Sequence, residues 1–319
     1  MPTDCISYQK SGYFTKLIVD YLDKKTELKS LYNRFPTLEN FKEQLEEKSQ
    51  NYPEENRKSL VTALENQYKG FQISEATSAN ISLLSNSKTF TITTGHQLNL
   101  FTGPLYFLYK IVSTITLCAT LKKEYPDYNF VPIYWMATED HDFEEINYFN
   151  FKGKKFCWNT ASSGPVGRLA TDGLASFFDV FASELGNGKN AELLKRLFQE
   201  SYLNHSNLAD ATRFLANSIF GEYGLVILDA DNQELKRSFV PFIKEELLLQ
   251  TAHKEVSKTT EKLKNYSIQV NPREINLFYI ENNLRERIVF ENGNYTVKKT
   301  DLSFSKEKLL QLVETHPEQ

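Results

Sequence analysis

The chain has 319 residues, of which 40% are hydrophobic and 24% charged, and its formal net charge is −4 at pH 7. This length and composition are typical of a folded protein with one large or two ordinary domains. The slightly acidic charge gives no global footprint for nucleic acid or for an anionic membrane, so neither is expected as a partner, although a local basic patch stays open.

Three cysteines, Cys5, Cys118 and Cys157, form no CxxC pair and no zinc-ligand spacing, and their odd number argues against a disulfide framework. The N-terminal residues lack the apolar core of a signal peptide. The longest apolar run, 105–121, is interrupted by Lys110 and by several Ser and Thr, so we expect a buried helix there and no membrane span. A cytoplasmic protein is expected.

Residues 1–88 are predicted to form a helical N-terminal segment. Apolar residues recur at helical spacing in two stripes, Phe14, Leu17, Ile18, Tyr21 and Leu22, and Leu60, Leu64 and Tyr68. Asn40, followed three residues later by Glu43, predicts a capping-box start for a charged helix that ends near Ser49.

Residues 89–147 are predicted to form the first half of a parallel sheet. A β-branched strand at 90–94 stops at Gly95, and Gly103-Pro104 is predicted to open a helix. A strand that is apolar on both faces follows at 131–137. Strand, helix and strand together predict a right-handed βαβ unit.

The remaining chain is predicted to contain an insertion, 148–222, and the second half of the sheet, 223–319. The insertion is expected to hold a hairpin at 151–156 and a helical pair at 190–220. The second half is expected to hold a strand at 224–230, a helix at 233–249 that is kinked or restarted at Pro241, strands at 275–280 and 287–290, and a helix at 302–314. The predicted fold class is α/β with a doubly wound parallel sheet.

A polar motif follows each of the first two predicted strands. Thr-Gly-His-Gln-Leu-Asn occupies 94–99 and runs on to Thr-Gly-Pro at 102–104, and Glu-Asp-His-Asp-Phe-Glu-Glu-Ile-Asn occupies 139–147. In open α/β sheets, ligands bind outside the carboxyl ends of the strands. We therefore expect both motifs to line one crevice.

His96 lies between a predicted strand and a predicted helix, where an imidazole could contact a phosphate or stabilise developing charge. The structural alternative is a turn histidine bonded to a nearby carbonyl. Gly95, Gln97 and Asn99 favour binding, because idle polar side chains packed between apolar elements cost free energy. Thr102 could cap the helix while Gly103 relieves a tight turn, and direct ligand contact is compatible with both.

The second motif opens with Glu139, Asp140, His141 and Asp142. These groups could hold a divalent ion, orient an amine, or act as general acid and base. Their consecutive placement does not suit one helical face, so no metal is predicted and recognition of a substrate amine or hydroxyl is favoured. Asp140 or Asp142 could instead cap a helix beginning near Phe143.

Late arginines could clamp a carboxylate or a phosphate, with surface charge as the alternative for each. The predicted substrate-binding residues are Glu139, Asn147, Arg273 and Arg285. The chain has no Gly-rich loop of the Walker or GxGxxG type, so ordinary P-loop or dinucleotide chemistry is not expected.

Two long segments, TTGHQLNLFTGPLYFLYKI and PIYWMATEDHDFEEIN, closely resemble the cysteine-adding enzymes of bacillithiol biosynthesis, the BshC family of cysteine ligases. The resemblance extends through most of the chain, including 224–230 and 269–278. It implies a cytoplasmic bacterial protein that joins L-cysteine to glucosaminyl malate by amide formation. It also implies a Rossmann-like core related to class I aminoacyl-tRNA synthetases, with inserted connecting segments and a C-terminal coiled coil that dimerises.

The resemblance also suggests functions for the two polar motifs. The sequence around His96 resembles the histidine signature of the synthetases, although only one of its two histidines is present. ATP or ADP is therefore the implied cofactor, and the implied nucleotide-binding residues are Gly95, His96, Gln97, Asn99, Thr102 and Gly103. The implied catalytic residues are His96, Asp140, His141 and Asp142.

Members of this family are considerably longer than this chain, which resembles their N-terminal portion and stops before the coiled coil. A non-catalytic remnant that binds nucleotide or substrate is therefore the alternative to a working ligase. A free-standing synthetase-like enzyme is a third possibility, but it would need a basic tRNA-binding surface that the composition does not indicate.

Overall fold

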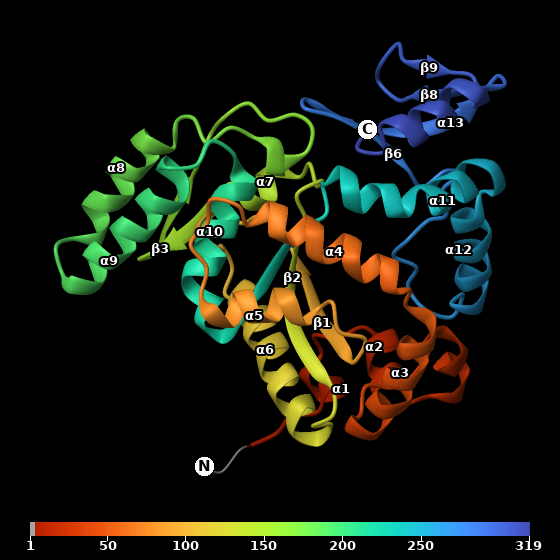
Figure 1. Cartoon of the computed structure of the whole chain (residues 1–319), viewed down its shortest axis with the longest axis horizontal. Coiled ribbons are helices and arrows are strands. Elements are labelled where there is room, and N and C mark those ends of the chain that lie inside the picture. Colours follow the sequence, from red (N-terminus) through yellow and green to blue (C-terminus); the bar gives the residue numbers. More distant parts are fainter. Residues whose placement is uncertain (1–3) are drawn as a thin grey trace.

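The computed structural model describes residues 4–319, so the first three residues of the predicted 1–88 segment lie outside the described residues. Its centre is a three-stranded parallel sheet with the strand order β1-β2-β5 (Figure 1). Strand β1 (Thr89–His96) pairs with β2 (Asn129–Met136) along its whole length, and β2 pairs with β5 (Val226–Asp229). The predicted α/β class with a parallel sheet is confirmed.

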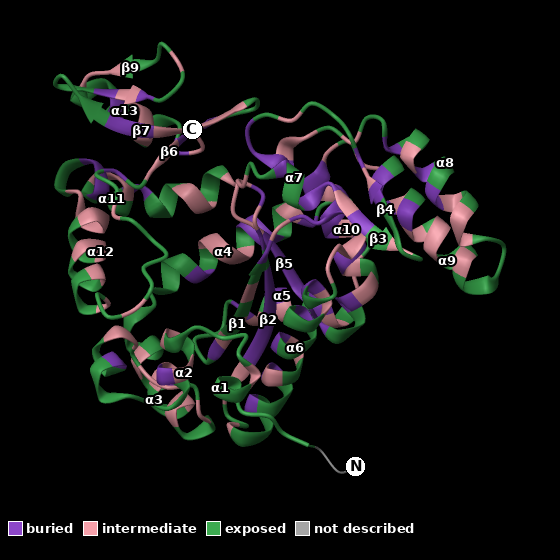
Figure 2. Cartoon of the chain, turned by 180° about the vertical axis from the view of Figure 1, so that it is seen from behind, coloured by how far each residue is buried: buried purple, intermediate pink, exposed green. Residues whose placement is uncertain are grey.

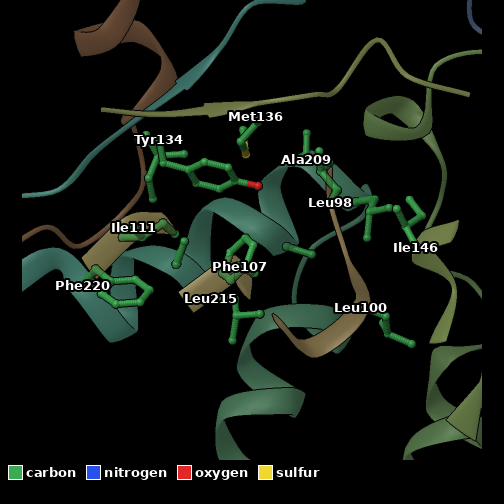
Figure 3. Packing of buried hydrophobic residues seen from close by; sticks show 14 of the residues in the cluster. Leu98, Leu100, Phe107, Ile111, Tyr134, Met136, Ile146, Ala209, Leu215 and Phe220 are labelled. Carbon is green, nitrogen blue, oxygen red and sulfur yellow. The ribbon is translucent and has the colours of Figure 1, made fainter. Parts of the chain in front are cut away.

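One face of the sheet carries the main hydrophobic core. Helices α6 (Tyr106–Glu124) and α10 (Leu208–Phe220) cover this face, and the side chains of Phe107, Tyr134 and Leu215 meet in its centre (Figure 3). Because successive strand residues point to opposite faces, Ile133 and Trp135 lie on the other side, facing α4 (Glu54–Gln67). Figure 2 shows buried residues concentrated along the strands and on α10.

Helices precede the sheet, as the apolar stripes predict. They are α1 (Tyr8–Ser11), α2 (Lys16–Leu22), the 3₁₀ helix η1 (Thr26–Leu31), α3 (Leu38–Asn51), α4 and α5 (Glu75–Leu83). The predicted start of the charged helix at Asn40 is wrong. Thr37 is the N-cap of α3, because its hydroxyl accepts a hydrogen bond from the backbone N–H of Asn40.

The junction between β1 and α6 differs from the prediction. Strand β1 continues through Gly95 to His96, and α6 begins at Tyr106 after the 3₁₀ turn η2 (Leu100–Thr102). No side chain caps α6, so the predicted cap from Thr102 is wrong. The ring of Phe101 packs against Phe149, Phe181 and Phe198. The backbone at Phe101 and Thr102 has positive φ, and this conformation directs the ring of Phe101 into the cluster.

The region predicted as an insertion contains the expected hairpin and helices. Strands β3 (Tyr148–Phe151) and β4 (Lys154–Cys157) are antiparallel. They are followed by the 3₁₀ turn η3 (Val166–Arg168), α8 (Leu174–Leu185), α9 (Lys189–Phe198), the π-helical turn η4 (Gln199–Leu203) and α10. Helix α10, after the 3₁₀ turn η5 (Gly221–Tyr223), returns the chain to β5 and is therefore the crossover helix of the sheet.

The C-terminal part contributes only β5 to the parallel sheet, among the described residues. Helix α11 (Gln233–Leu249) continues through Pro241, and α12 (Thr251–Lys262) follows it. Strands β6 (Phe278–Glu281), β7 (Leu284–Glu291), β8 (Asn294–Val297) and β9 (Ser303–Phe304) form a separate antiparallel sheet with its own hydrophobic cluster. The predicted helix at 302–314 begins later, as α13 (Lys306–Thr315), because Ser305 caps it. The division into four intervals stays a prediction.

Within residues 4–319, no helix combines the length and the hydrophobicity that a bilayer crossing requires.

Gly103 offers a test of the tight turn before α6. It has φ +47°, and a Cβ atom there would lie 2.5 Å from Cβ of Asn99, so Gly103→Ala combines backbone strain with a clash. We expect Gly103→Ala to lower the free energy of unfolding by about 2–4 kcal/mol. The control Gly153→Ala also has positive φ but meets nothing within 4 Å, and we expect a loss of ~1 kcal/mol. Equal shifts in urea denaturation for both variants would contradict the close approach of Gly103 to Asn99.

Candidate functional site

The two polar motifs meet beyond the carboxyl ends of β1 and β2. The side-chain amide of Gln97 donates hydrogen bonds to Asp140 Oδ2 at 2.9 Å and to Glu145 Oε2 at 2.8 Å. The amide of Asn99 donates to the carbonyl of Glu145 at 3.3 Å, and the backbone N–H of Ala137 donates to the carbonyl of His96. The two motifs therefore lie together at this edge of the sheet, as the sequence predicts.

His96 is buried, with 6% of its surface exposed, and its ring lies against Tyr106 and Phe107. Its Nδ1 is 3.0 Å from the carbonyl oxygen of Gln97, so Nδ1 carries the proton and donates. Burial lowers the pKa of His96, which favours the neutral ring. Nε2 is consequently a hydrogen-bond acceptor, and it has no partner among the described residues.

Asn99 shares this buried environment. It is 4% exposed, and its Oδ1 also has no hydrogen-bond partner among residues 4–319. Gly103 packs so closely against it that no side chain would fit there. Gly95 is exposed, and its carbonyl accepts a hydrogen bond from the ammonium of Lys110 on α6. The predicted first-motif residues thus surround the start of α6, with two unpartnered acceptor atoms in their interior.

Asp140 is held in its ionised form. Burial opposes ionisation, but hydrogen bonds from Gln97 and from the backbone of His141 and Asp142, together with the charge of Arg285, lower the pKa of Asp140. A carboxylate that stays charged at neutral pH is suited to hold an ammonium group.

His141 is half exposed and lies between two carboxylates, with Nδ1 at 3.6 Å from Asp140 and 3.9 Å from Asp142. Nη1 of Arg285 lies 2.9 Å from the same nitrogen. Because a guanidinium only donates, Nδ1 of His141 accepts, and the ring proton is on Nε2. The structure thus brings Arg285, on β7, to the second motif as a neighbour of His141.

Asp142 occupies the N-cap position of the short helix α7 (Phe143–Ile146), but its side chain makes no capping hydrogen bond. Asp140 accepts from the backbone N–H of His141 and does not cap α7 either. The capping alternative for these two carboxylates is therefore wrong, and both remain candidates for ligand contact.

A metal ion could bind one donor atom from each of Asp140, His141 and Asp142, because these three atoms lie within 4.8 Å of one another. Arg285, however, places a positive charge on the nitrogen of His141 that points to this group. The lone pair on this nitrogen, which a metal ion would need, is therefore taken by the guanidinium, and the residue types in the sequence likewise favour an amine over a metal.

Two predicted substrate-binding residues, Asn147 and Arg273, differ in their surroundings, and Oδ1 of Asn147 is a buried acceptor without a partner among residues 4–319. Asn147 is 2% exposed, and its backbone joins α7 to Trp158, donating to Phe143 and accepting from the Trp158 N–H. Arg273 is exposed in the loop before β6 and does not line the cavity described below.

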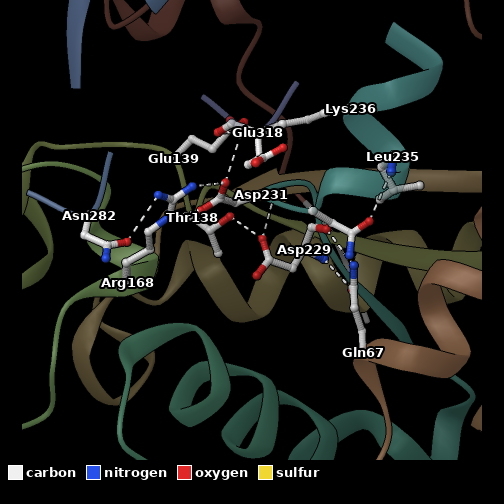
Figure 4. Close-up of polar contacts among 11 residues, drawn as sticks. Gln67, Thr138, Glu139, Arg168, Asp229, Asp231, Leu235, Lys236, Asn282 and Glu318 are labelled. Atoms are coloured by element: carbon white, nitrogen blue, oxygen red, sulfur yellow. Dashed lines mark hydrogen bonds and ion pairs between the residues drawn. The ribbon is translucent and has the colours of Figure 1, made fainter. Parts of the chain in front are cut away.

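Glu139 belongs to an ion-pair network that sequence patterns did not reveal (Figure 4). Arg168 donates two hydrogen bonds to Asp231, at 2.6 and 2.8 Å. Lys236 bridges Asp231, at 2.9 Å, and Glu139, at 2.7 Å. Burial opposes ionisation of Asp231, but these two cations lower its pKa. The network therefore fixes Glu139 against α11.

Asp229 anchors the same region from the end of β5. Its carboxylate accepts hydrogen bonds from the hydroxyl of Thr138 and from the backbone N–H of Asp231. Burial raises the pKa of Asp229. The position of Asp229 and Asp231 at the end of a strand was the sequence signal for this network, whereas Arg168 lies in the 3₁₀ turn η3, where no motif marks it.

A cavity of about 600 Å³ lies beside this network, on the face of the sheet opposite α6. Its walls are mostly apolar and come from the sheet, α4, α11, α13 and β6, while Glu139, Lys236 and Arg285 supply charges. His96, Gln97 and Asn99 do not line it. The carboxyl edge of the sheet thus has a buried polar cluster around His96 and a charged rim beside an apolar cavity.

Comparison with known proteins assigns this chain to a family. The whole chain, residues 1–319, matches the family model described as "Bacillithiol biosynthesis BshC, N-terminal Rossmann-like domain". Relatives named "Putative cysteine ligase BshC" include those of Flavobacterium psychrophilum, 70% identical, Flavobacterium johnsoniae, 66% identical, and Staphylococcus carnosus, 28% identical.

The first two alignments cover 100% of this chain and 60% of each relative, and the third covers 93% of this chain and 58% of the relative. The chain therefore spans about 60% of the length of the curated relatives it matches. It belongs to the BshC family, and its fold is the N-terminal Rossmann-like domain of that family.

Proposed function

We propose that this chain is the nucleotide- and substrate-binding part of a cysteine ligase of bacillithiol biosynthesis, which joins L-cysteine to glucosaminyl malate by amide formation. The observation that supports it most is the amide of Gln97, which ties the motif after β1 to the carboxylates of Asp140 and Glu145 after β2. The names of the relatives agree with a ligase of this pathway.

Amine recognition is the first task of the site. Amide formation needs an amine that is oriented and then relieved of its proton. Asp140, held ionised, would pair with the ammonium form, and Nε2–H of His141 would donate a hydrogen bond to a substrate oxygen. Asp142, an exposed carboxylate at the same position, would take the proton.

Nucleotide recognition would use the buried polar groups around His96. The unpartnered Nε2 of His96 and Oδ1 of Asn99 fit a ligand with hydrogen-bond donors, because both atoms are acceptors. Their match is a hydroxyl or amino group of ATP or ADP, and not a phosphate oxygen, which revises the predicted contact of His96. The N-terminus of α6 favours an anion nearby. Bound ATP would supply the activation of the cysteine carboxylate.

Location and assembly belong to the same proposal. Cys118 and Cys157 are thiols in the structure, as in a reducing cytoplasm. Dimerisation through a coiled coil would depend on the part of the relatives that this chain does not match. The alternative function is a non-catalytic remnant that binds the same ligands.

The ligase proposal is tested in a bacterial strain that lacks its own enzyme, complemented with this chain joined to the remaining region of the Flavobacterium psychrophilum relative. We expect bacillithiol to be restored, and His96→Ala to lower its amount at least about tenfold, because a polar contact in the site is lost. His253→Ala, on α12 and away from the site, is the control and should leave the thiol level unchanged.

Full production by His96→Ala would remove the assigned role of this histidine. No production by the unsubstituted extended chain would favour the remnant, and production by residues 1–319 alone would show that the longer region is dispensable.

Gln97→Leu tests how Asp140 is kept ionised. Loss of the amide donor should move the pKa of Asp140 upward, toward its ordinary value. A lowered pKa stabilises the folded state above the unfolded-state pKa, and this contribution disappears as the pH falls through the folded-state pKa. Ionisation of Asp140 should therefore stabilise the folded state of the variant less at neutral pH than it stabilises the unsubstituted chain. Carbon-13 NMR titration of the Asp140 carboxyl measures the change, with the exposed Gln311→Leu as control; an unchanged pKa would contradict the bridge.

Lys236→Met tests the network that holds Glu139. It leaves Glu139 without its cation and Asp231 with Arg168 alone, so the free energy of unfolding should fall by about 1–3 kcal/mol. Lys244→Met, on the same helix, breaks an exposed pair with Glu314 and should cost less than ~1 kcal/mol. Urea denaturation compares them, and an equal loss in both variants would show that the network does not fix Glu139.

A further inference from the structure

The cavity of about 600 Å³ lies between the parallel sheet and the C-terminal antiparallel unit. Its base is the sheet face opposite α6, and α4 and α11 flank it. Helix α13 and strand β6, which belong to the antiparallel unit, form the remaining wall. Sites for small organic ligands have volumes of roughly 300–1,000 Å³. The cavity therefore has the size of a small-molecule site.

Aromatic side chains from both units line this cavity. Trp135 comes from β2 and Phe239 from α11, while Phe278 and Tyr279 come from β6. Trp135 is 46% exposed and Phe239 is 54% exposed, so both rings offer surface to a ligand. Covering such rings removes apolar surface from water. The walls consequently favour a ligand with an apolar body.

The charged side chains of the cavity wall leave one positive charge in excess. Among residues 4–319, the Asp, Glu, Lys and Arg side chains that line the cavity are those of Glu139, Lys236 and Arg285. Lys236 is paired with Glu139 and with Asp231 (Figure 4). Arg285 forms no ion pair with any residue that the structure describes. The cavity thus offers an unpaired guanidinium to a negatively charged group.

Two aromatic neighbours hold the guanidinium of Arg285 in place. Its central carbon lies 3.9 Å from the ring centroid of Phe278, and Nη1 lies 2.9 Å from Nδ1 of His141. Asp140 is close enough for this charge to lower its pKa, but it accepts its hydrogen bonds from Gln97 and from the backbone. A guanidinium has five N–H donors in a planar fork that matches a carboxylate. Arg285 therefore keeps donors for a ligand anion.

We propose that this cavity binds an organic carboxylate with an apolar ring or chain, and that Arg285 binds its carboxylate group. The guanidinium would donate hydrogen bonds to the carboxylate oxygens, and the apolar body would lie against Trp135 and Phe239. A sugar fits less well, because the mostly apolar walls offer few partners for its hydroxyl groups. The inference does not depend on the proposed ligase reaction.

The candidate functional site would respond to such a ligand through Arg285. The guanidinium that faces the cavity also donates to Nδ1 of His141 in the second motif. A carboxylate bound to Arg285 would compete for its N–H donors and alter this hydrogen bond. The NMR signals of the His141 ring should therefore shift on binding. His205, which stacks on Phe71 away from the cavity, is the internal control.

Calorimetry on residues 1–319 tests the proposal with 4-phenylbutyrate as the probe and with 4-phenylbutanamide and 4-phenylbutylamine for comparison. We expect the acid to bind at least about tenfold more tightly than the amide, because only the carboxylate pairs with Arg285. The amine should bind least tightly. The acid should also change the tryptophan fluorescence, and Trp135→Phe should abolish this change because Trp158 is buried in the core.

Arg285→Met should lower the affinity for the acid at least about tenfold and leave the affinity for the amide nearly unchanged. Arg287→Met is the matched control, because Arg287 lies on the same strand but outside the cavity wall. Thr93→Tyr would fill the cavity from β1 and should weaken the binding of acid and amide alike. Thr120→Tyr, on the exposed side of α6, should leave both affinities unchanged.

Equal affinities for acid and amide would overturn the assignment of Arg285, and this comparison needs no substitution of that residue. Unchanged binding in Thr93→Tyr would place the ligand elsewhere. The absence of acid binding up to the solubility limit would also overturn the proposal. The same holds if binding is lost when the chain is joined to the remaining region of the Flavobacterium psychrophilum relative, because protein would then fill the cavity. An unshifted His141 ring in the acid complex would contradict the contact through Arg285.

Discussion

The parallel register of β1 and β2 is the constraint on which the rest of the site depends. Pairing from Thr89↔Asn129 to His96↔Met136 makes both strands end at the same level, so the segments that follow them leave the sheet side by side. Without this register, Gln97 could not reach Asp140, which lies 43 positions away in the sequence. The core residues Phe107 and Tyr134 fix the register, because a one-residue slip would turn Tyr134 toward the opposite face.

The charged side chains at this edge of the sheet form separate groups with different neighbours. Carboxylates gather around the amide of Gln97, whereas Arg168 and Lys236 are already neutralised by Asp231 and Glu139. At the second motif Arg285 is a single positive charge beside several carboxylates, so a positively charged amine would still find carboxylate partners there. The buried acceptors on His96 and Asn99 provide a different environment, suited to an uncharged donor group. One edge of the sheet thus combines a negatively charged environment with an uncharged one.

Local patterns in the sequence were sufficient for elements whose formation depends on neighbouring residues. The β-branched run of β1 and the apolar spacing of α6 predict those elements, and the two polar motifs predict their shared edge. Distant contacts explain the failures. Phe101 adopts positive φ to fill a cluster with Phe149 and Phe198, and Arg168 meets Asp231 across 63 positions. No local pattern distinguishes the antiparallel strands β6–β9 from further strands of the parallel sheet.

A double-mutant cycle between Gln97→Leu and Asp140→Ala tests most directly whether the two motifs form a single site. The free energy of unfolding is measured by urea denaturation for the chain, both single variants and the double variant. A shared site predicts that the two losses are not additive, with a coupling of at least ~0.5 kcal/mol. Additive losses would show that Gln97 and Asp140 act independently, and would contradict a site formed jointly by the ends of β1 and β2.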